Sequence, residues 1–176
     1  MKSGRVLRLM KRSGVAVAGL ALALLATAIS AGAGRAADEK DRAAMAQTVE
    51  QFESAWNKHD AHAFAMTFTE DADFTNVVGA HVQGRGNVEA FHAPIFAGRF
   101  KDTHQTGVIR SIRFLRADLA AVDVEWEMTG LKGPDGSALP DRKGLLNWVM
   151  AKQGDGSWLI QIMHNTELTN TPAVPK

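Results

Sequence analysis

Imidazole and amide side chains are the groups in this chain whose chemistry and position suggest a site. The sequence has six histidines, no cysteine and no tyrosine. Without cysteine there is no thiol nucleophile, thiolate metal ligand or disulfide. Without tyrosine there is no phenol to act as an acid or an oxyanion donor. Histidine is therefore the first residue type to consider for acid–base or ligand-binding chemistry.

His92 is the leading candidate for a catalytic residue. It follows Val88 by four positions and precedes Phe96 by four, so a helix would place all three side chains on one apolar face. Two interpretations remain open. The imidazole could be a core histidine bonded to a backbone carbonyl, or it could be an acid/base or ligand-holding group at the floor of a cavity.

Two further histidines and an asparagine lie on predicted strands. His104 begins a strand and shares a face with Thr106, so it is a second catalytic candidate if that face lines the cavity; a surface position is the alternative. His164 continues the alternation of Ile162, and Asn165 lies on the opposite face. Both faces of this strand carry apolar residues. The pattern leaves open which face lines the cavity, and both residues are ligand-binding candidates.

Asn76 and two tryptophans complete the predicted ligand-binding set. Asn76 is in phase with Phe74 and is expected to point inward, where its amide could anchor a polar ligand group or make a structural hydrogen bond. Asp73 is out of that phase and is expected to face solvent. Trp126 and Trp148 could stack on a flat ligand; packing in the core or against a second subunit is the alternative.

The sequence predicts neither a metal site nor a cofactor. Three histidines facing one cavity could bind a divalent ion, but none has a metal-ligand spacing. His59 and His62 lie three positions apart across a predicted helix junction, unlike an HExxH helix. The segment Gly84-Arg-Gly86 has too few glycines for a dinucleotide fingerprint, and no doubly wound unit surrounds it.

The elements that must position these residues are early helices and long late strands. Apolar residues at three- and four-residue spacing predict helices over residues 38–58, 60–68 and 87–97. Alternation predicts strands over residues 71–78, 103–115, 119–131, 142–152 and 158–168. The expected fold is α+β, with three N-terminal helices packed on a strongly curved, mostly antiparallel sheet that forms a cone with an internal cavity.

Residues 1–37 are predicted to be a secretory signal peptide, cleaved near 33–37. A basic start precedes the uncharged apolar run Val15–Ile29 and then small residues. The run is shorter than the roughly 20 residues of a membrane span. An uncleaved anchor is the alternative. Cleavage would leave one domain over residues 38–170, a loose tail over 171–176, and no stable membrane insertion.

The predicted mature chain is acidic. It keeps fourteen of the twenty Lys and Arg residues and all nineteen Asp and Glu residues, a formal charge of −5. This surface does not favour nucleic-acid binding. The leader has no twin-arginine pair, so we expect export by the general secretory route, to the periplasm or the extracellular space.

Three segments resemble a known superfamily: WNKHDAHAFAMTFTEDADFTNVVG, HVQGRGNVEAFHAPIFAGRFKDT and WLIQIMHNTEL. They are similar to the nuclear-transport-factor-2-like, or SnoaL-like, proteins, and within them to the SgcJ/EcaC branch. The resemblance covers about residues 40–169 and implies the cone fold. In ketosteroid isomerases and polyketide cyclases of this fold, the strand similar to ADFTNVVG carries a catalytic aspartate. The matching residue here is Asn76, and an amide is not a base, which argues against both activities in their usual form.

Two functions follow as the main hypotheses. The chain could be an exported enzyme that acts on a small apolar or aromatic substrate, with His92 as acid/base and Asn76 orienting the substrate. It could instead be a non-catalytic ligand-binding domain, or a dimerisation module like the association domains of this fold. Apolar residues on both faces of the last strands also predict a homodimer through the sheet.

Overall fold

The computed structural model describes residues 37–168. The chain divides into two compact units, Met1–Lys40 and Asp41–Lys176, and all elements discussed below belong to the second. The predicted leader, except residue 37, and the predicted tail at 171–176 lie outside the described residues. Among the described residues, no helix is long and apolar enough to cross a membrane.

Six strands form one curved sheet in the order β2-β1-β6-β5-β4-β3. They are β1 (Phe68–Thr75), β2 (His81–Gln83), β3 (His104–Arg116), β4 (Leu119–Thr129), β5 (Arg142–Lys152) and β6 (Trp158–Glu167). Only β1 and β6 pair in parallel; the other neighbours are antiparallel. The sequence pattern did not predict β2.

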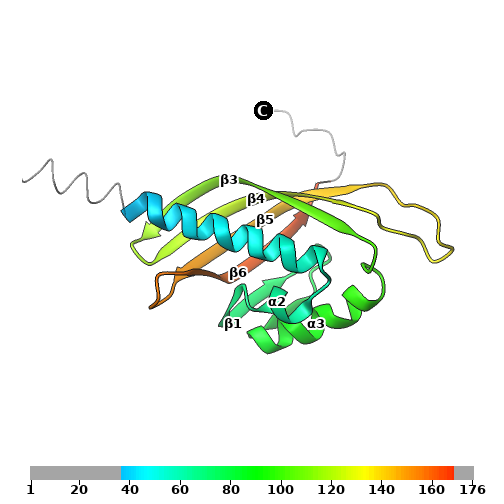
Figure 1. Cartoon of the computed structure of the whole chain (residues 1–176), viewed down its shortest axis with the longest axis horizontal. Coiled ribbons are helices and arrows are strands. Elements are labelled where there is room, and N and C mark those ends of the chain that lie inside the picture. Colours follow the sequence, from blue (N-terminus) through cyan, green and yellow to red (C-terminus); the bar gives the residue numbers. More distant parts are fainter. Residues whose placement is uncertain (1–36, 169–176) are drawn as a thin grey trace, which may run out of the picture. The chain divides into compact units, whose positions relative to one another are not determined.

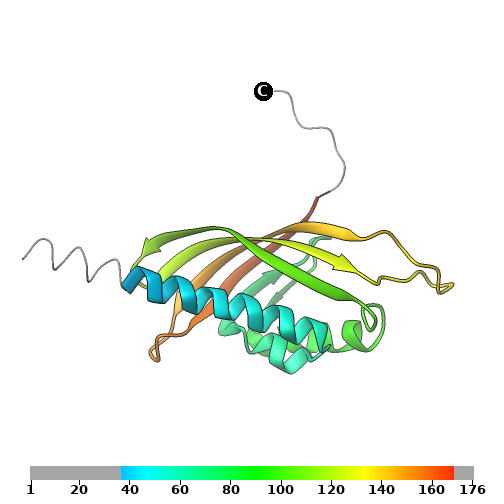
Figure 2. The same ribbon diagram turned by 45° about the horizontal axis from the view of Figure 1, so that its top comes forward.

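The helices lie on one face of this sheet (Figures 1 and 2). The first helix covers residues 41–57 of this unit, and α2 (Ala61–Ala65) and α3 (Arg85–Ala97) follow. Phe52 on the first helix lies 4.5 Å from the ring of Phe64 on α2 and 5.1 Å from the ring of Trp148 on β5. These contacts join helices and sheet in one core, which confirms the predicted fold class.

Local capping chemistry confirms one helix start and corrects another. The Asp60 carboxylate accepts a 2.9 Å hydrogen bond from the backbone N–H of Ala63 and caps α2, whose start agrees with the helix predicted from residue 60. This helix ends at Ala65, earlier than expected, because Phe68 already begins β1. The predicted start of α3 at residue 87 is two residues late, because the helix begins at Arg85. Gly84 is the N-cap, with a φ of 85° that favours glycine.

Among the register shifts in the sheet, one bulge in β3 and one in β6 reverse the side-chain alternation near the predicted site residues. In β3 the pairing passes from Ile109–Val124 to Ser111–Asp123, so Arg110 is an extra residue. In β6 it passes from Ile160–Met150 to Ile162–Val149, so Gln161 is extra. An inserted residue moves every later side chain to the opposite face of its strand. In β3 the inward-facing residues are therefore odd-numbered before the bulge and even-numbered after it, and in β6 they are even-numbered before and odd-numbered after.

Candidate functional site

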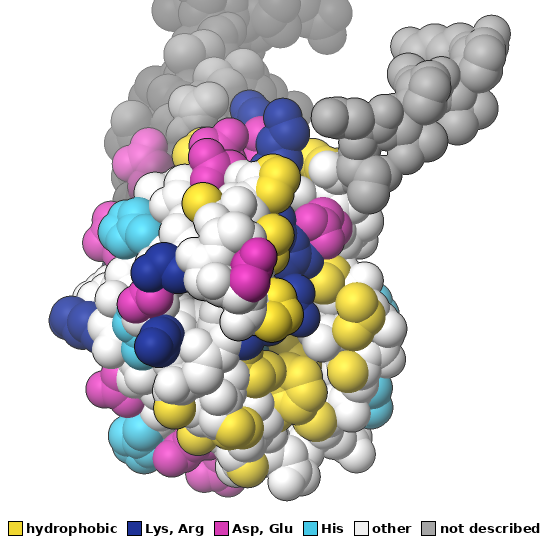
Figure 3. All heavy atoms as spheres, turned by 90° about the vertical axis from the view of Figure 1, so that its right-hand side faces the viewer, with side chains coloured by type: hydrophobic (Ala, Val, Ile, Leu, Met, Phe, Trp, Pro, Cys, Tyr) yellow, Lys and Arg dark blue, Asp and Glu magenta, His cyan; other side chains and the backbone are white. Residues whose placement is uncertain are grey.

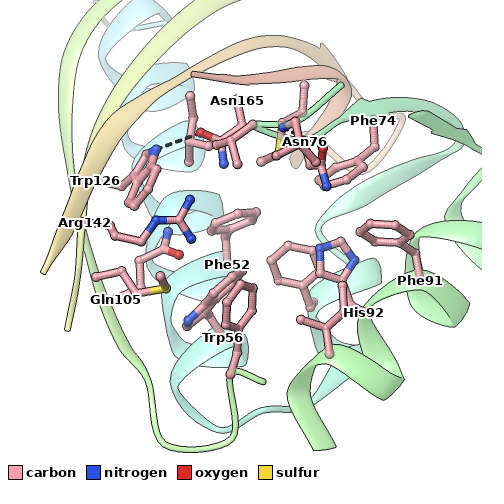
Figure 4. Close-up of a pocket in the computed structure, with 18 of the residues that line it drawn as sticks. Phe52, Trp56, Phe74, Asn76, Phe91, His92, Gln105, Trp126, Arg142 and Asn165 are labelled. Carbon is pink, nitrogen blue, oxygen red and sulfur yellow. Dashed lines mark hydrogen bonds between the residues drawn. The ribbon is translucent and has the colours of Figure 1, made fainter. Parts of the chain in front are cut away.

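A cavity of about 290 Å³ lies between the helices and the sheet (Figure 4). Its walls are mainly aromatic and aliphatic, with rings from the first helix, α2, α3 and β1. Six polar side chains also line it: Asn76, His92, Arg99, Gln105, Arg142 and Asn165. No aspartate or glutamate is among its described lining residues.

His92 projects from α3 among aromatic rings. Its ring centroid lies 4.3 Å from that of Phe64 and 5.0 Å from that of Phe74, and the residue is 3% exposed. Its Nδ1 donates a 2.7 Å hydrogen bond to the carbonyl of Val88. A carbonyl can only accept, so Nδ1 carries the proton of the neutral ring. Nε2 is then an acceptor on a cavity-lining residue, and it has no partner among the described residues.

Burial sets the protonation state of His92. Loss of hydration lowers its pKa from 6.5 to about 4, against the smaller opposing effect of the bond to Val88. The ring is therefore neutral near pH 7. Both interpretations of His92 made from the sequence describe part of its environment: a backbone-bonded ring in an apolar core, on the wall of a cavity.

Asn76 follows the end of β1 and lines the cavity. Its Oδ1 accepts hydrogen bonds from the backbone N–H groups of Val78 (3.0 Å) and Ala80 (2.9 Å), which hold the turn into β2. This is the structural bond that the sequence left open. Because Oδ1 is occupied by donors, Nδ2 is the free end of the amide, a hydrogen-bond donor toward the cavity.

Trp126 on β4 is fixed by Asn165 on β6. The indole Nε1 donates a 2.8 Å hydrogen bond to Asn165 Oδ1, which leaves Asn165 Nδ2 as a donor (Figure 4). The sheet pairs Trp126 with Gly107 on one side and Gly144 on the other. A Cβ at Gly144 would lie only 2.5 Å from the indole ring. Glycine at this position lets the ring cross β5 to reach β6.

Gln105 is a lining residue that the sequence interpretation missed. Its backbone is held by Asn57, whose Oδ1 accepts from Gln105 N (2.7 Å) and whose Nδ2 donates to Gln105 O (2.8 Å). Gln105 is 5% exposed. Its side-chain amide has no hydrogen-bond partner among the described residues, although a buried amide normally requires one.

Arg142 is the second missed residue. Its Nε and Nη2 donate to the two carboxylate oxygens of Glu167, at 2.7 and 2.6 Å. The pair raises the pKa of Arg142 and lowers that of Glu167. Arg142 alternates in phase with Gly144 and Leu146, both buried. That two-residue period was a usable signal that the side chain turns inward.

Three predicted site residues lie away from the cavity. His104 and His164 are both exposed on the opposite face of the sheet. For His104 this is the surface alternative, and on β6 the face of Asn165 is the one that lines the cavity. The bulges at Arg110 and Gln161 account for the ambiguity of the sequence pattern, because apolar residues at one end of each strand do not share a face with those at the other. Trp148 is 2% exposed, packs in the core and does not line the cavity, which favours its core interpretation.

The rim beside the cavity is basic. Arg99 lines the cavity and also a second hollow, together with Lys101 and Lys132. Lys132 makes a 2.8 Å ion pair with Asp102, and this pairing lowers the pKa of Asp102. Figure 3 shows a hollow where hydrophobic side chains gather next to a band of Lys and Arg. Among the described residues, no group of three or more His, Cys, Asp or Glu could hold a metal ion.

This fold and its cavity define a SnoaL-like protein. The SnoaL-like domain model matches residues 49–151, and the chain belongs to that family. No protein of curated function matches it. Residues near its termini lie outside this match, but the matched span includes the first helix from Val49 onward, α2, α3 and most of the sheet.

Solved structures agree on the fold. A domain of unknown function with a cystatin-like fold from Nostoc punctiforme is 30% identical, covering 74% of this chain and 78% of that one, with a TM-score of 0.66. A candidate scytalone dehydratase from Novosphingobium aromaticivorans has 14% identity, coverages of 81% and 93%, and a TM-score of 0.66. A ketosteroid isomerase-like protein from Erwinia carotovora atroseptica has 16% identity, coverages of 72% and 95%, and a TM-score of 0.59.

Proposed function

We propose that this protein binds a small, ring-containing organic molecule in the cavity. The observation that carries the proposal concerns His92 and Gln105. Both side chains are more than nine-tenths buried, both line the cavity, and the His92 Nε2 and the Gln105 amide lack partners among the described residues. Neither group is among the enclosed unpaired atoms of the described residues, so both reach the open space of the cavity. A ligand that bonds to them there would gain about 0.5–1.5 kcal/mol for each neutral hydrogen bond.

The volume and the walls indicate the kind of ligand. A cavity of about 150 Å³ lined by apolar side chains holds one benzene molecule, so about 290 Å³ suits a ligand of roughly two rings. The rings of Phe52, Phe64 and Phe74 supply flat surfaces. The neutral His92 offers an acceptor, so the ligand needs a hydroxyl or N–H group at that end.

The test is a titration with 2-naphthol and with 2-methoxynaphthalene, which lacks the hydroxyl donor, followed by ligand fluorescence. We expect 2-naphthol to bind about fivefold more tightly, the size of one neutral hydrogen bond. His92→Phe should abolish this preference, and the exposed His104→Phe should leave it unchanged. Absence of 2-naphthol binding up to millimolar concentration would refute the proposal.

Proton transfer is the second candidate function, and the free Nε2 of His92 favours it. A neutral imidazole in the cavity can take a proton from a carbon next to a ligand carbonyl, while Asn76 Nδ2 or Asn165 Nδ2 donates to the enolate oxygen. The likeness to dehydratase and isomerase-like folds is compatible with this chemistry. A pKa of about 4 makes His92 a weak base, so binding remains the first proposal.

A proton-transfer activity can be measured on 2-tetralone, a two-ring ketone. The wild type should accelerate exchange of deuterium from heavy water into the carbon next to the carbonyl, and His92→Phe should not. Equal rates in the two proteins would leave binding alone as the function.

Three further expectations from the sequence belong to this proposal. The narrower resemblance to the SgcJ/EcaC branch is compatible with a small-molecule pocket. The leader-like first 37 residues support export by the general secretory route. We also propose a homodimer through the outer face of the sheet, supported by exposed apolar side chains at Val108 (60%) and Ile162 (37%).

A further inference from the structure

We propose that the ligand carries a carboxylate, which the free edge of Arg142 binds at the end of the cavity near Asn165 and Gln105. This inference rests on the proposed function, because it specifies the ligand of the same cavity. It assigns the polar contacts at the end of the cavity opposite His92 (Figure 4).

The Glu167 pair leaves three of the five N–H groups of Arg142 available. A guanidinium has five N–H groups, and Glu167 occupies one on Nε and one on Nη2. Both hydrogens of Nη1 and the second hydrogen of Nη2 remain. One hydrogen of Nη1 and the free hydrogen of Nη2 form the end-on edge, which matches the two oxygens of a second carboxylate. The side chain of Arg142 is 18% exposed, so this edge lies in a largely desolvated site.

The neighbouring amides reinforce a preference for an anion. The bond from Trp126 to Asn165 Oδ1 fixes which end of the amide is free, and that end, Nδ2, is a donor. The unpartnered Gln105 amide lines the same cavity and is drawn on the Arg142 side of it in Figure 4, and its NH₂ group is a third donor from a third strand. A carboxylate, which has about four acceptor sites and no donor when ionised, can receive all of these bonds.

The charges around the cavity favour the same ligand. Glu167 compensates Arg142, but Arg99 adds a positive charge to the lining, which contains no acid among its described residues. Lys101 lies beside it on the adjoining rim, where Lys132 is compensated by Asp102. On a chain whose predicted mature form is acidic, this local excess of cations would attract an anion to the entrance.

The ligand class that combines these features is a one- or two-ring aromatic carboxylate with a hydroxyl or amino group at its other end. The carboxylate would meet Arg142, Asn165 and Gln105. The rings would lie against the aromatic walls. The hydroxyl or amino group would donate to His92 Nε2, which the folded protein keeps free of a proton near neutral pH.

The experiment compares 6-hydroxy-2-naphthoate with its carboxamide, an uncharged molecule of nearly the same shape, by fluorescence titration at pH 7.5 and 0.15 M salt. We expect the wild type to bind the acid at least tenfold more tightly, because hydrogen bonds to charged groups are worth about 1.5–3 kcal/mol. Arg142→Gln should reduce that ratio to below about threefold. The exposed Arg113→Gln, which removes one positive charge on β3, should preserve it.

Each result supports or overturns the inference. Equal affinities for acid and amide in the wild type would overturn it, and 2-naphthol binding would then still support the proposed function. If Arg142→Gln still binds the acid at least tenfold more tightly than the amide, the carboxylate binds elsewhere, and the inference is overturned as well. If acid, amide and 2-naphthol all fail to bind, the proposed function and this inference fail together. The double variant Arg142→Gln/Glu167→Gln, which leaves no unpaired charge, repeats the measurement if Arg142→Gln does not fold.

Discussion

Trp126 and Asn165 are hydrogen-bonded at 2.8 Å across the intervening strand β5, from the indole Nε1 to the amide Oδ1. The bond fixes both side chains. It holds the indole over Gly144, and it turns Asn165 Nδ2 away from Trp126. The polarity of this cavity wall is therefore set by a contact between two lining residues, without any ligand.

Gly144→Ala should disrupt this contact. The added Cβ would lie 2.5 Å from the Trp126 ring and closer still to the carbonyl oxygen of Thr166. Overpacking of this kind costs typically 1–3 kcal/mol, and we expect a loss at the upper end of that range in urea unfolding. Gly154→Ala is the matched control, since its Cβ would meet nothing within 4 Å, and it should change stability by less than about 0.5 kcal/mol. Equal effects of the two substitutions would contradict the packing argument.

Replacing His92 should change how stability depends on pH. The folded-state pKa of about 4 lies below the unfolded value of 6.5, so below pH 6.5 the unfolded chain binds a proton that the folded protein does not. The contribution to stability is complete above pH 6.5 and is lost as the pH falls to about 4. The loss amounts to roughly 3 kcal/mol.

Urea unfolding of the wild type and His92→Phe at several values between pH 7.5 and pH 4 measures this effect. The stability difference between the two proteins should shift toward the variant by that amount as the pH falls. The remaining groups titrate in both proteins and cancel in the difference. Parallel curves would show that the imidazole is hydrated in the folded state.

Gln105→Leu should separate stability from binding. The buried amide has no partner among the described residues, so an apolar side chain of similar size should leave stability unchanged or raise it by about 0.5–1 kcal/mol. The same change should weaken binding of 6-hydroxy-2-naphthoate severalfold, because one donor to the carboxylate is lost. A variant that is destabilised by more than about 1 kcal/mol would reveal a structural partner for the amide.

Ile162→Glu tests the proposed homodimer. Ile162 is 37% exposed on the face of the sheet opposite the cavity, and a charge at the centre of a sheet-to-sheet interface would oppose association. We expect a dimer for the wild type and a monomer for the variant in sedimentation velocity, with little change in ligand affinity. A wild type that remains monomeric at 50–100 μM, roughly the range where weak interfaces still associate, would contradict the proposal.

The sequence was sufficient to predict three helices, though not all of their ends, and the buried face of α3. The four-residue spacing of Val88, His92 and Phe96 survives folding because a helix without insertions keeps its period. The long strands were less predictable. A single extra residue, Arg110 in β3, reverses the alternation, and neither its type nor its neighbours mark it as a bulge. Gln105 was missed for that reason. His104 is even-numbered like the apolar residues beyond the bulge, Ile112 and Phe114, so simple alternation put His104 and not Gln105 on their face.

Arg142 was missed for a different reason. Its phase with Gly144 and Leu146 is readable, but a charged residue at the start of a strand is ordinarily solvated. Its partner Glu167 lies on another strand, and no sequence pattern links the two. Pairing of that kind is visible only when the register of β5 and β6 is known.

The extra residue at Gln161 has an evolutionary consequence. Loss of its codon alone would restore simple alternation from Trp158 onward and leave every other side chain on its present face. Loss of one codon between the bulge and His164, with the bulge kept, would instead carry an imidazole from outside to inside and withdraw the amide now bonded to Trp126. A lineage could thereby exchange a neutral donor for a titratable group in one mutational event, without replacing any amino acid. Divergence of chemistry among relatives with this architecture could thus arise through deletions and insertions as readily as through substitutions.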